Sequence, residues 1–356
     1  MNYKIIPLIA CIALSLYALD CGEKTPPVSK GDSTAAANPS TVYVPPAEKP
    51  KDLEPMSQST MMKFVFTKGE KFSYHMRTIT DVSETTDSVV QSSMQDLAFT
   101  YSFEVLGTDP DGTGRLSAEC SHVQFKGKYG NREMSYDSSS PKDKAQEKTF
   151  AQYSAVLRNP FEIEVSAEGT IISIKNVDRI IEKIAGSDYK SMKLEARKQI
   201  AEDFANNTLK NQLQIVFQKL SDKPVANDSS WTIEWEGNLG FLQVKNTALY
   251  TLQGVKTDAS GSMAHIGIAM KTQYIGPKKM DTGQGMATIQ ALDAKGTGST
   301  VFDLTKHRTK KRSMDQKLLT RLVVDPPQEL KAQMPNIGLI KISQDASIKT
   351  TVVEVQ

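Results

Sequence analysis

Apolar and polar residues alternate along much of this chain, which is the pattern of a β-strand with one buried face. The alternation is clear over residues 72–76, and again over residues 99–105, 161–165 and 264–270. Between residues 177 and 220 the apolar residues recur instead every three or four positions, as on one face of an α-helix. The sequence therefore predicts an α+β protein, mainly antiparallel β-sheet, with a central helical insertion.

The order of these patterns predicts a β-rich globular region over residues 59–356. Residues 59–175 are expected to form a first sheet, residues 176–222 the helices and residues 223–356 a second sheet. Residues 101–112 and 250–261 look like two copies of one unit, because each has a strand that starts with Tyr and ends in a Thr-Asp-x-x-Gly turn. A turn with positive φ explains the shared glycine. The two sheets would then be related; the alternative is that any two β-hairpins share this pattern.

The first 21 residues have the features of an export signal. Lys4 precedes an almost unbroken apolar run from Ile5 to Leu19, which is short for a membrane-spanning helix, and Cys21 follows it. The segment resembles a bacterial lipoprotein signal. We therefore predict that residues 1–21 are a signal peptide and that Cys21 is lipidated, for example with palmitate. Asp20 stands where a small residue is usual, and an uncleaved apolar anchor is the alternative.

Residues 22–58 are predicted to be a disordered tether. They contain seven of the 16 prolines of the chain, separated mainly by small and polar residues. Such a segment buries too little apolar surface to offset the entropy lost on ordering, and its prolines keep it extended. A lipid on Cys21 and this tether would place the protein in the bacterial cell envelope, attached to a membrane. We expect the outer membrane, on its periplasmic or surface face.

The composition argues against several kinds of site. Basic and acidic residues nearly balance, 43 against 41, so no nucleic-acid partner is expected. Cys120 is the only cysteine besides Cys11 and Cys21, so the exported part has no intramolecular disulfide and no thiolate zinc cluster. Its place in an alternating strand predicts a buried thiol.

The histidines and the basic residues give no stronger signal. The four histidines, at positions 75, 122, 265 and 307, have no His or Cys neighbour at the spacing of a local metal site. Residues 306–312 form the one basic run, which we interpret as the solvated edge of a hairpin. Contact with anionic lipid or polysaccharide is the alternative. We predict no catalytic residue, no metal site and no cofactor.

Four segments resemble a family of uncharacterised bacterial secreted proteins and lipoproteins, catalogued as a domain of unknown function. They are residues 72–76 (Phe-Ser-Tyr-His-Met), 161–184, 222–231 and 296–303 (Gly-Thr-Gly-Ser-Thr-Val-Phe-Asp), within a likeness that covers most of residues 62–324. A glycine usually follows the Phe-Asp strand in this family, and Lys306 or His307 stands there in this chain. The resemblance implies no catalytic residues.

The sequence is best explained by a non-enzymatic envelope lipoprotein that binds a ligand or a protein partner. The ligand would be apolar, and the partner an envelope protein. The first alternative is a hydrolase with a site assembled from distant residues, and the second is a structural or assembly factor. A cleft that gathers Ser, His and a carboxylate would favour the hydrolase. An apolar cavity would favour the carrier, and an exposed apolar patch would favour assembly.

Overall fold

The computed structural model describes residues 49–355, apart from residues 51, 57, 141–145, 147–148, 240–241, 260, 283–284 and 335–336. The predicted signal peptide, the predicted lipidation site Cys21 and most of the predicted tether lie outside the described residues.

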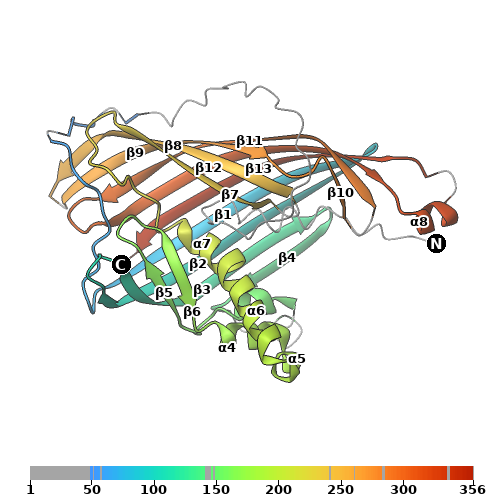
Figure 1. The fold of residues 1–356 in the computed structure, drawn as a ribbon, viewed down its shortest axis with the longest axis horizontal. Helices are drawn as coiled ribbons and strands as arrows, with labels where there is room; N and C mark the ends of the chain where they lie inside the picture. The colour runs from blue at the N-terminus through green and yellow to red at the C-terminus, as the bar shows by residue number, and fades with distance from the viewer. Residues whose placement is uncertain are drawn as a thin grey trace.

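Within the described residues, thirteen β-strands form one antiparallel sheet (Figure 1). Buried and exposed positions alternate along most strands, so one face of the sheet is packed and the other is solvated. Some strands are long for a globular protein, and β2 has 20 residues. The strands are β1 (Lys71–Thr86), β2 (Val89–Thr108), β3 (Gly114–Tyr129), β4 (Arg132–Asp137), β5 (Phe161–Val165), β6 (Ile171–Lys175), β7 (Ser230–Leu239), β8 (Leu242–Asp258), β9 (Gly261–Tyr274), β10 (Lys279–Asp281), β11 (Met286–Asp303), β12 (Arg308–Asp325) and β13 (Ile340–Val355).

The strand order explains why there is one sheet and not two. Neighbouring strands follow the order β6-β5-β3-β2-β1-β13-β12-β11-β9-β8-β7, with β4 beside β3 and β10 beside β11. The first strand pairs with the last, from Ser73–Val355 to Thr86–Ile342. The predicted α+β class is confirmed, but the two expected sheets are joined into one by the β1–β13 pair. The two similar segments form the β2–β3 and β8–β9 hairpins, one on each side of that pair.

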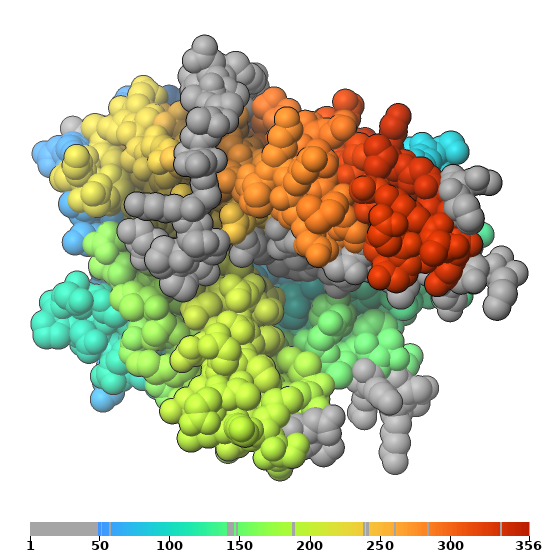
Figure 2. Space-filling model, turned by 45° about the vertical axis from the view of Figure 1, so that its right-hand side comes forward, coloured from blue at the N-terminus to red at the C-terminus, as the bar shows by residue number. Residues whose placement is uncertain are grey.

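Short helices follow β6 and form the predicted helical insertion (Figure 1). This part of the chain, coloured yellow-green, lies at the lower side of the molecule in Figure 2. They are α4 (Asp178–Ala185), α5 (Ser187–Ser191), α6 (Leu194–Phe204), the π-helix η2 (Ala205–Leu209) and α7 (Lys210–Gln214), while α3 (Ala151–Ser154) and α8 (Gln328–Gln333) lie outside the insertion. Gly186 ends α4 with φ 68°, a conformation that glycine adopts readily. Leu209, Leu213 and Phe217 are buried against the sheet. Among the described residues, no helix has the length and apolar character of a membrane span.

Two clusters of buried apolar side chains occupy the packed face. The larger one, called here the main core, joins the helices to the strands and is rich in aromatic rings such as Phe64, Phe103 and Phe217. The second, called here the distal cluster, lies further along the strands; its buried members are Val82, Leu239, Leu242, Val244, Ala287, Ile289, Ala294, Leu318, Leu322, Val324, Ile342, Ala346 and Ile348. All of these described members belong to strands, so the packed face extends beyond the helices.

The described end of the predicted tether is attached to the sheet. The backbone N–H groups of Glu54 and Val255 each donate to the other residue's carbonyl at 2.9 Å, and Met56 packs against the main core. Gly254 permits this approach, because a Cβ at that position would lie 2.8 Å from the Glu54 carbonyl oxygen. The proposal of a free tether therefore applies to the residues that precede this contact.

Candidate functional site

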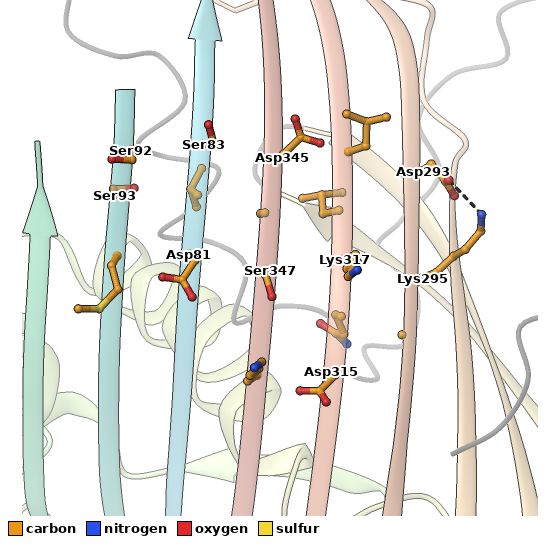
Figure 3. Close-up of a pocket in the computed structure, with 18 of the residues that line it drawn as sticks. Asp81, Ser83, Ser92, Ser93, Asp293, Lys295, Asp315, Lys317, Asp345 and Ser347 are labelled. Carbon is orange, nitrogen blue, oxygen red and sulfur yellow. Dashed lines mark hydrogen bonds and ion pairs between the residues drawn. The ribbon is translucent and has the colours of Figure 1, made fainter. Parts of the chain in front are cut away.

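The solvated face of the sheet is hollowed across its centre (Figure 3). This outer hollow has a volume of about 1050 Å³ and is lined by β1, β2, β11, β12 and β13, with Lys128 from β3. The strand register decides which side chains meet in it. Asp81 is aligned with Ser347, Ser347 with Lys317, and Lys317 with Lys295. Four neighbouring strands thus contribute one row of polar side chains.

The outer hollow carries positive and negative side chains in equal numbers. Its charged residues are Asp81, Asp293, Asp315, Asp345, Lys128, Lys295, Lys317 and Lys349. Lys295 pairs with Asp293 at 3.0 Å, and Lys128 pairs at 3.5 Å with Glu133, which lies outside the lining. Asp315 and Lys349 are aligned across β12 and β13, yet no ion pair joins either of them to a described residue.

The described lining does not assemble a serine, a histidine and a carboxylate. It includes serines and aspartates but no histidine and no cysteine. A serine nucleophile needs a base within hydrogen-bond reach, and a lysine can serve. Lys317 is aligned with Ser347, but no hydrogen bond joins a serine of the described lining to a lysine or an aspartate. The outer hollow therefore gives no support to the hydrolase alternative.

The distal cluster on the packed face contains polar side chains among its apolar ones. Thr320 lies between Leu318 and Leu322 on β12, and Gln344 is aligned with it on β13. Both residues are 1% exposed, and neither the Thr320 hydroxyl nor the Gln344 Oε1 has a hydrogen-bond partner among the described residues. A buried polar group without a partner is destabilising by about 1–3 kcal/mol, so these two atoms need an explanation.

A second pair of unpartnered polar atoms lies on β7 and β8. Trp235 is aligned with Asn246, whose Oδ1 accepts a hydrogen bond from the Thr272 hydroxyl at 2.7 Å. The Trp235 indole N–H and the Asn246 Nδ2 have no acceptor among the described residues. Trp231 lies on the same strand face as Trp235, and its ring stacks on Tyr250 with centroids 5.5 Å apart. Both tryptophans contact the main core.

Two of the four histidines lie in one row of the solvated face, with Thr100 between them. His75 is aligned with Thr100, and Thr100 with His122, across β1, β2 and β3. His75 Nδ1 lies 3.2 Å from the Thr100 hydroxyl, and His122 Nε2 lies 3.1 Å from Asp137 Oδ1. Partial burial, and then the nearby His122, lower the pKa of His75. Sequence reasoning missed this row because its members are far apart in the chain.

This row is neither a catalytic triad nor a metal site. The Ser139 hydroxyl donates to Asp137 at 2.6 Å, and not to His122. The hydroxyl and the backbone N–H of Ser139 both donate to Asp137 Oδ1. These two hydrogen bonds, followed by the one with His122, hold the pKa of Asp137 well below its usual range. His265 and His307 lie apart from the row, on β9 and in the turn before β12. Among the described residues, no three His, Cys, Asp or Glu side chains are placed to hold a metal ion.

Cys120 is buried in the main core, as its strand pattern predicts. Burial raises the pKa of its thiol to about 12, so the thiolate, which is the reactive form, is scarce near neutral pH.

The basic run lies at the turn between β11 and β12 and is partly neutralised. Arg308 pairs with Glu70 at 2.7 Å and with Glu354 at 2.8 Å, and Lys310 also pairs with Glu354 at 2.8 Å. These pairs occupy charges that an anionic polymer would need. The prediction of a solvated sheet edge is wrong, because β12 lies between β11 and β13 and Arg312 is 5% exposed. His307 has φ 53°, in the left-handed region that favours glycine.

The chain belongs to the family of unknown function DUF6263. The family pattern matches residues 111–308, more than half of the chain, and runs from the β2–β3 turn to the start of β12. The resemblance to an uncharacterised domain family is confirmed at this level. No curated protein matches the chain.

Several solved structures show a remote likeness. Lipovitellin, solved for its lipid–protein interactions, matches at 11% identity with a TM-score of 0.41, over 82% of this chain and 25% of that chain. OccK2 (OpdF) and OpdK with vanillate, both from Pseudomonas aeruginosa, match at 6% and 7% identity, each with a TM-score of 0.16. These two matches cover 81% and 80% of this chain and 98% and 99% of theirs. This chain spans about a quarter of the lipovitellin chain. At these scores none of the three bears on its function.

Proposed function

We propose that this chain is a non-enzymatic lipoprotein of the bacterial cell envelope that binds an amphiphilic ligand with an apolar chain, such as a fatty acid, against the distal cluster. The apolar run that ends at Cys21 and the proline-rich segment after it support the location and the lipid anchor. The binding role is supported by the distal cluster, a group of buried apolar side chains to which the described helices contribute no residue.

The observation that carries the binding proposal is the set of buried polar atoms without partners. Ligand sites are mostly apolar with a few placed polar groups, which is the composition found here. The Trp235 N–H and the Asn246 Nδ2 are both donors on aligned residues, so an acceptor oxygen of a carboxylate or ester would satisfy them. The Thr320 hydroxyl and the Gln344 Oε1 would bind a second polar group. The apolar chain of the ligand would lie on the leucines, isoleucines and valines of the distal cluster.

A matched pair of glutamine variants tests this proposal. Gln344 has an unpartnered Oε1, whereas Gln95, 3% exposed, donates from Nε2 to the Tyr129 hydroxyl at 2.6 Å. Binding of a radiolabelled long-chain fatty acid is measured for the wild type, Gln344→Met and Gln95→Met. We expect Gln344→Met to weaken binding about tenfold, the effect of one hydrogen bond of about 1.4 kcal/mol. Gln95→Met should lower stability and leave the affinity unchanged.

Two results would contradict the amphiphile proposal. One is a wild-type protein that binds no fatty acid after detergent-free purification. The other is an equal affinity in the two variants. Either result would leave binding of an envelope protein partner as the proposed function.

The lipid anchor has a separate test. Cells that express the wild type or Cys21→Ala are grown with a radioactive fatty acid and fractionated. We expect label and membrane association in the wild type, and the loss of both in Cys21→Ala. A variant that still takes up label and stays in the membrane fraction would show that Cys21 is not the attachment point.

A further inference from the structure

The outer hollow and the distal cluster lie on opposite faces of the sheet. Lys317 contributes a charged side chain to the hollow, and the side chain of the next residue, Leu318, packs in the distal cluster. Val82, Leu318 and Ala346 of the distal cluster also line the hollow, where the sheet is one strand layer thick. Successive side chains of a strand point to opposite faces, so the two surfaces are separated by the thickness of the sheet. The charged side chains of the outer hollow therefore lie on the face opposite to the side chains of the proposed amphiphile site.

The outer hollow carries both signs of charge, and among its described residues only Lys295 and Asp293 pair with each other. Asp315 and Lys349 are aligned on neighbouring strands, an arrangement that normally gives a stabilising pair, but no ion pair joins them. Lys317 is aligned with Lys295, and like charges placed opposite each other repel. Asp293 compensates Lys295, whereas no described carboxylate pairs with Lys317. Both signs of charge are thus available to a ligand.

We propose that the outer hollow binds a short, extended peptide that carries both carboxylate and ammonium groups. Same-face residues of a strand are about 6.6 Å apart and neighbouring strands about 4.8 Å apart. The charges of the hollow therefore repeat at distances close to those between side chains on one face of an extended peptide. Its volume of about 1050 Å³ lies at the upper end of the range for small-molecule pockets and suits a ligand of several residues.

Other ligand classes fit the lining less well. A polyanion would meet four aspartates, and a polycation would meet four lysines. A sugar would find no aromatic ring to stack on, because the described lining has none. A peptide with both charges can place each group against its opposite.

The proposal is tested by calorimetric titration of the full chain at low salt. The probes are three peptides of about ten residues: one with alternating Lys and Glu, one of Glu alone and one of Lys alone. We expect the alternating peptide to bind about tenfold more tightly than either single-charge peptide. A Lys317→Gln/Lys349→Gln double variant should weaken this binding about tenfold. Lys311→Gln serves as the control, because Lys311 is exposed on the same face of β12 and lies outside the lining.

Each other outcome would overturn the proposal. No binding of the alternating peptide would show that the hollow is an ordinary solvated surface. Equal or tighter binding of the all-Glu peptide would make it an anion site. An equal loss in the double variant and in Lys311→Gln, with unchanged melting temperatures, would show that the peptide contacts the surface charge in general and not the hollow.

Discussion

Replacing Thr320 with valine should stabilise the ligand-free protein, although it removes a buried hydroxyl. Thr320 is 1% exposed, lies between Leu318 and Leu322, and its hydroxyl has no described partner. Burying such a group without a hydrogen bond is destabilising by about 1–3 kcal/mol, and valine replaces it with a methyl group of similar size. We expect the free energy of unfolding to rise by about 1 kcal/mol, the lower end of this range.

The same substitution at Thr272 provides the contrast. Thr272 is 2% exposed, and its hydroxyl donates to Asn246 Oδ1 at 2.7 Å. Thr272→Val removes that bond and leaves a buried amide oxygen without a donor, so it should lower the free energy of unfolding by about 1–3 kcal/mol. Urea unfolding of the delipidated protein, followed by tryptophan fluorescence, gives both values if the slope m is unchanged. Equal destabilisation by the two variants would show that Thr320 has a partner, and would refute the reasoning.

Glu354→Gln should lower the free energy of unfolding by about 3 kcal/mol in a urea titration, because the Glu354 side chain is only 8% exposed and pairs with Arg308; unchanged stability would contradict this. Trp235→Ala should lower it by about 3–5 kcal/mol, because Trp235 is 7% exposed; a neutral effect would place the ring at a binding surface. Burial lowers the pKa of His75 from 6.5, so the stability that neutral His75 contributes is present above pH 6.5 and is lost as the pH falls through the lowered value. His75→Asn should therefore flatten the acid side of the stability profile, and an unchanged profile would refute this.

The class of the fold could be predicted because strand and helix patterns are local. Residues 72–76 and 99–105 alternate in sequence and form β1 and β2 in the structure. The pairing of β1 with β13 could not be predicted in the same way. It joins residues from the two ends of the globular region. No local sequence feature of β1 or β13 indicates which strand it pairs with. The two expected sheets are one sheet for this reason.

The candidate sites depend on the register of strand pairing, which is difficult to predict from the sequence. The outer hollow combines side chains from six strands. His75 and His122 lie in one row only because the register of β1, β2 and β3 aligns both of them with Thr100. The proposed amphiphile site on the packed face is easier to recognise in the sequence. Thr320 and Gln344 occupy positions where the alternation calls for an apolar residue, and such a break in the pattern could have identified them.

The central claim is that the packed face binds an amphiphile, and native mass spectrometry tests it most directly. The protein from residue 22 onward is purified without detergent, stripped of lipid and mixed with a long-chain fatty acid. We expect an adduct of one fatty acid on the wild type and on Gln95→Met, and a much weaker adduct on Gln344→Met. A wild-type spectrum without any adduct, in the presence of excess fatty acid, would contradict the claim.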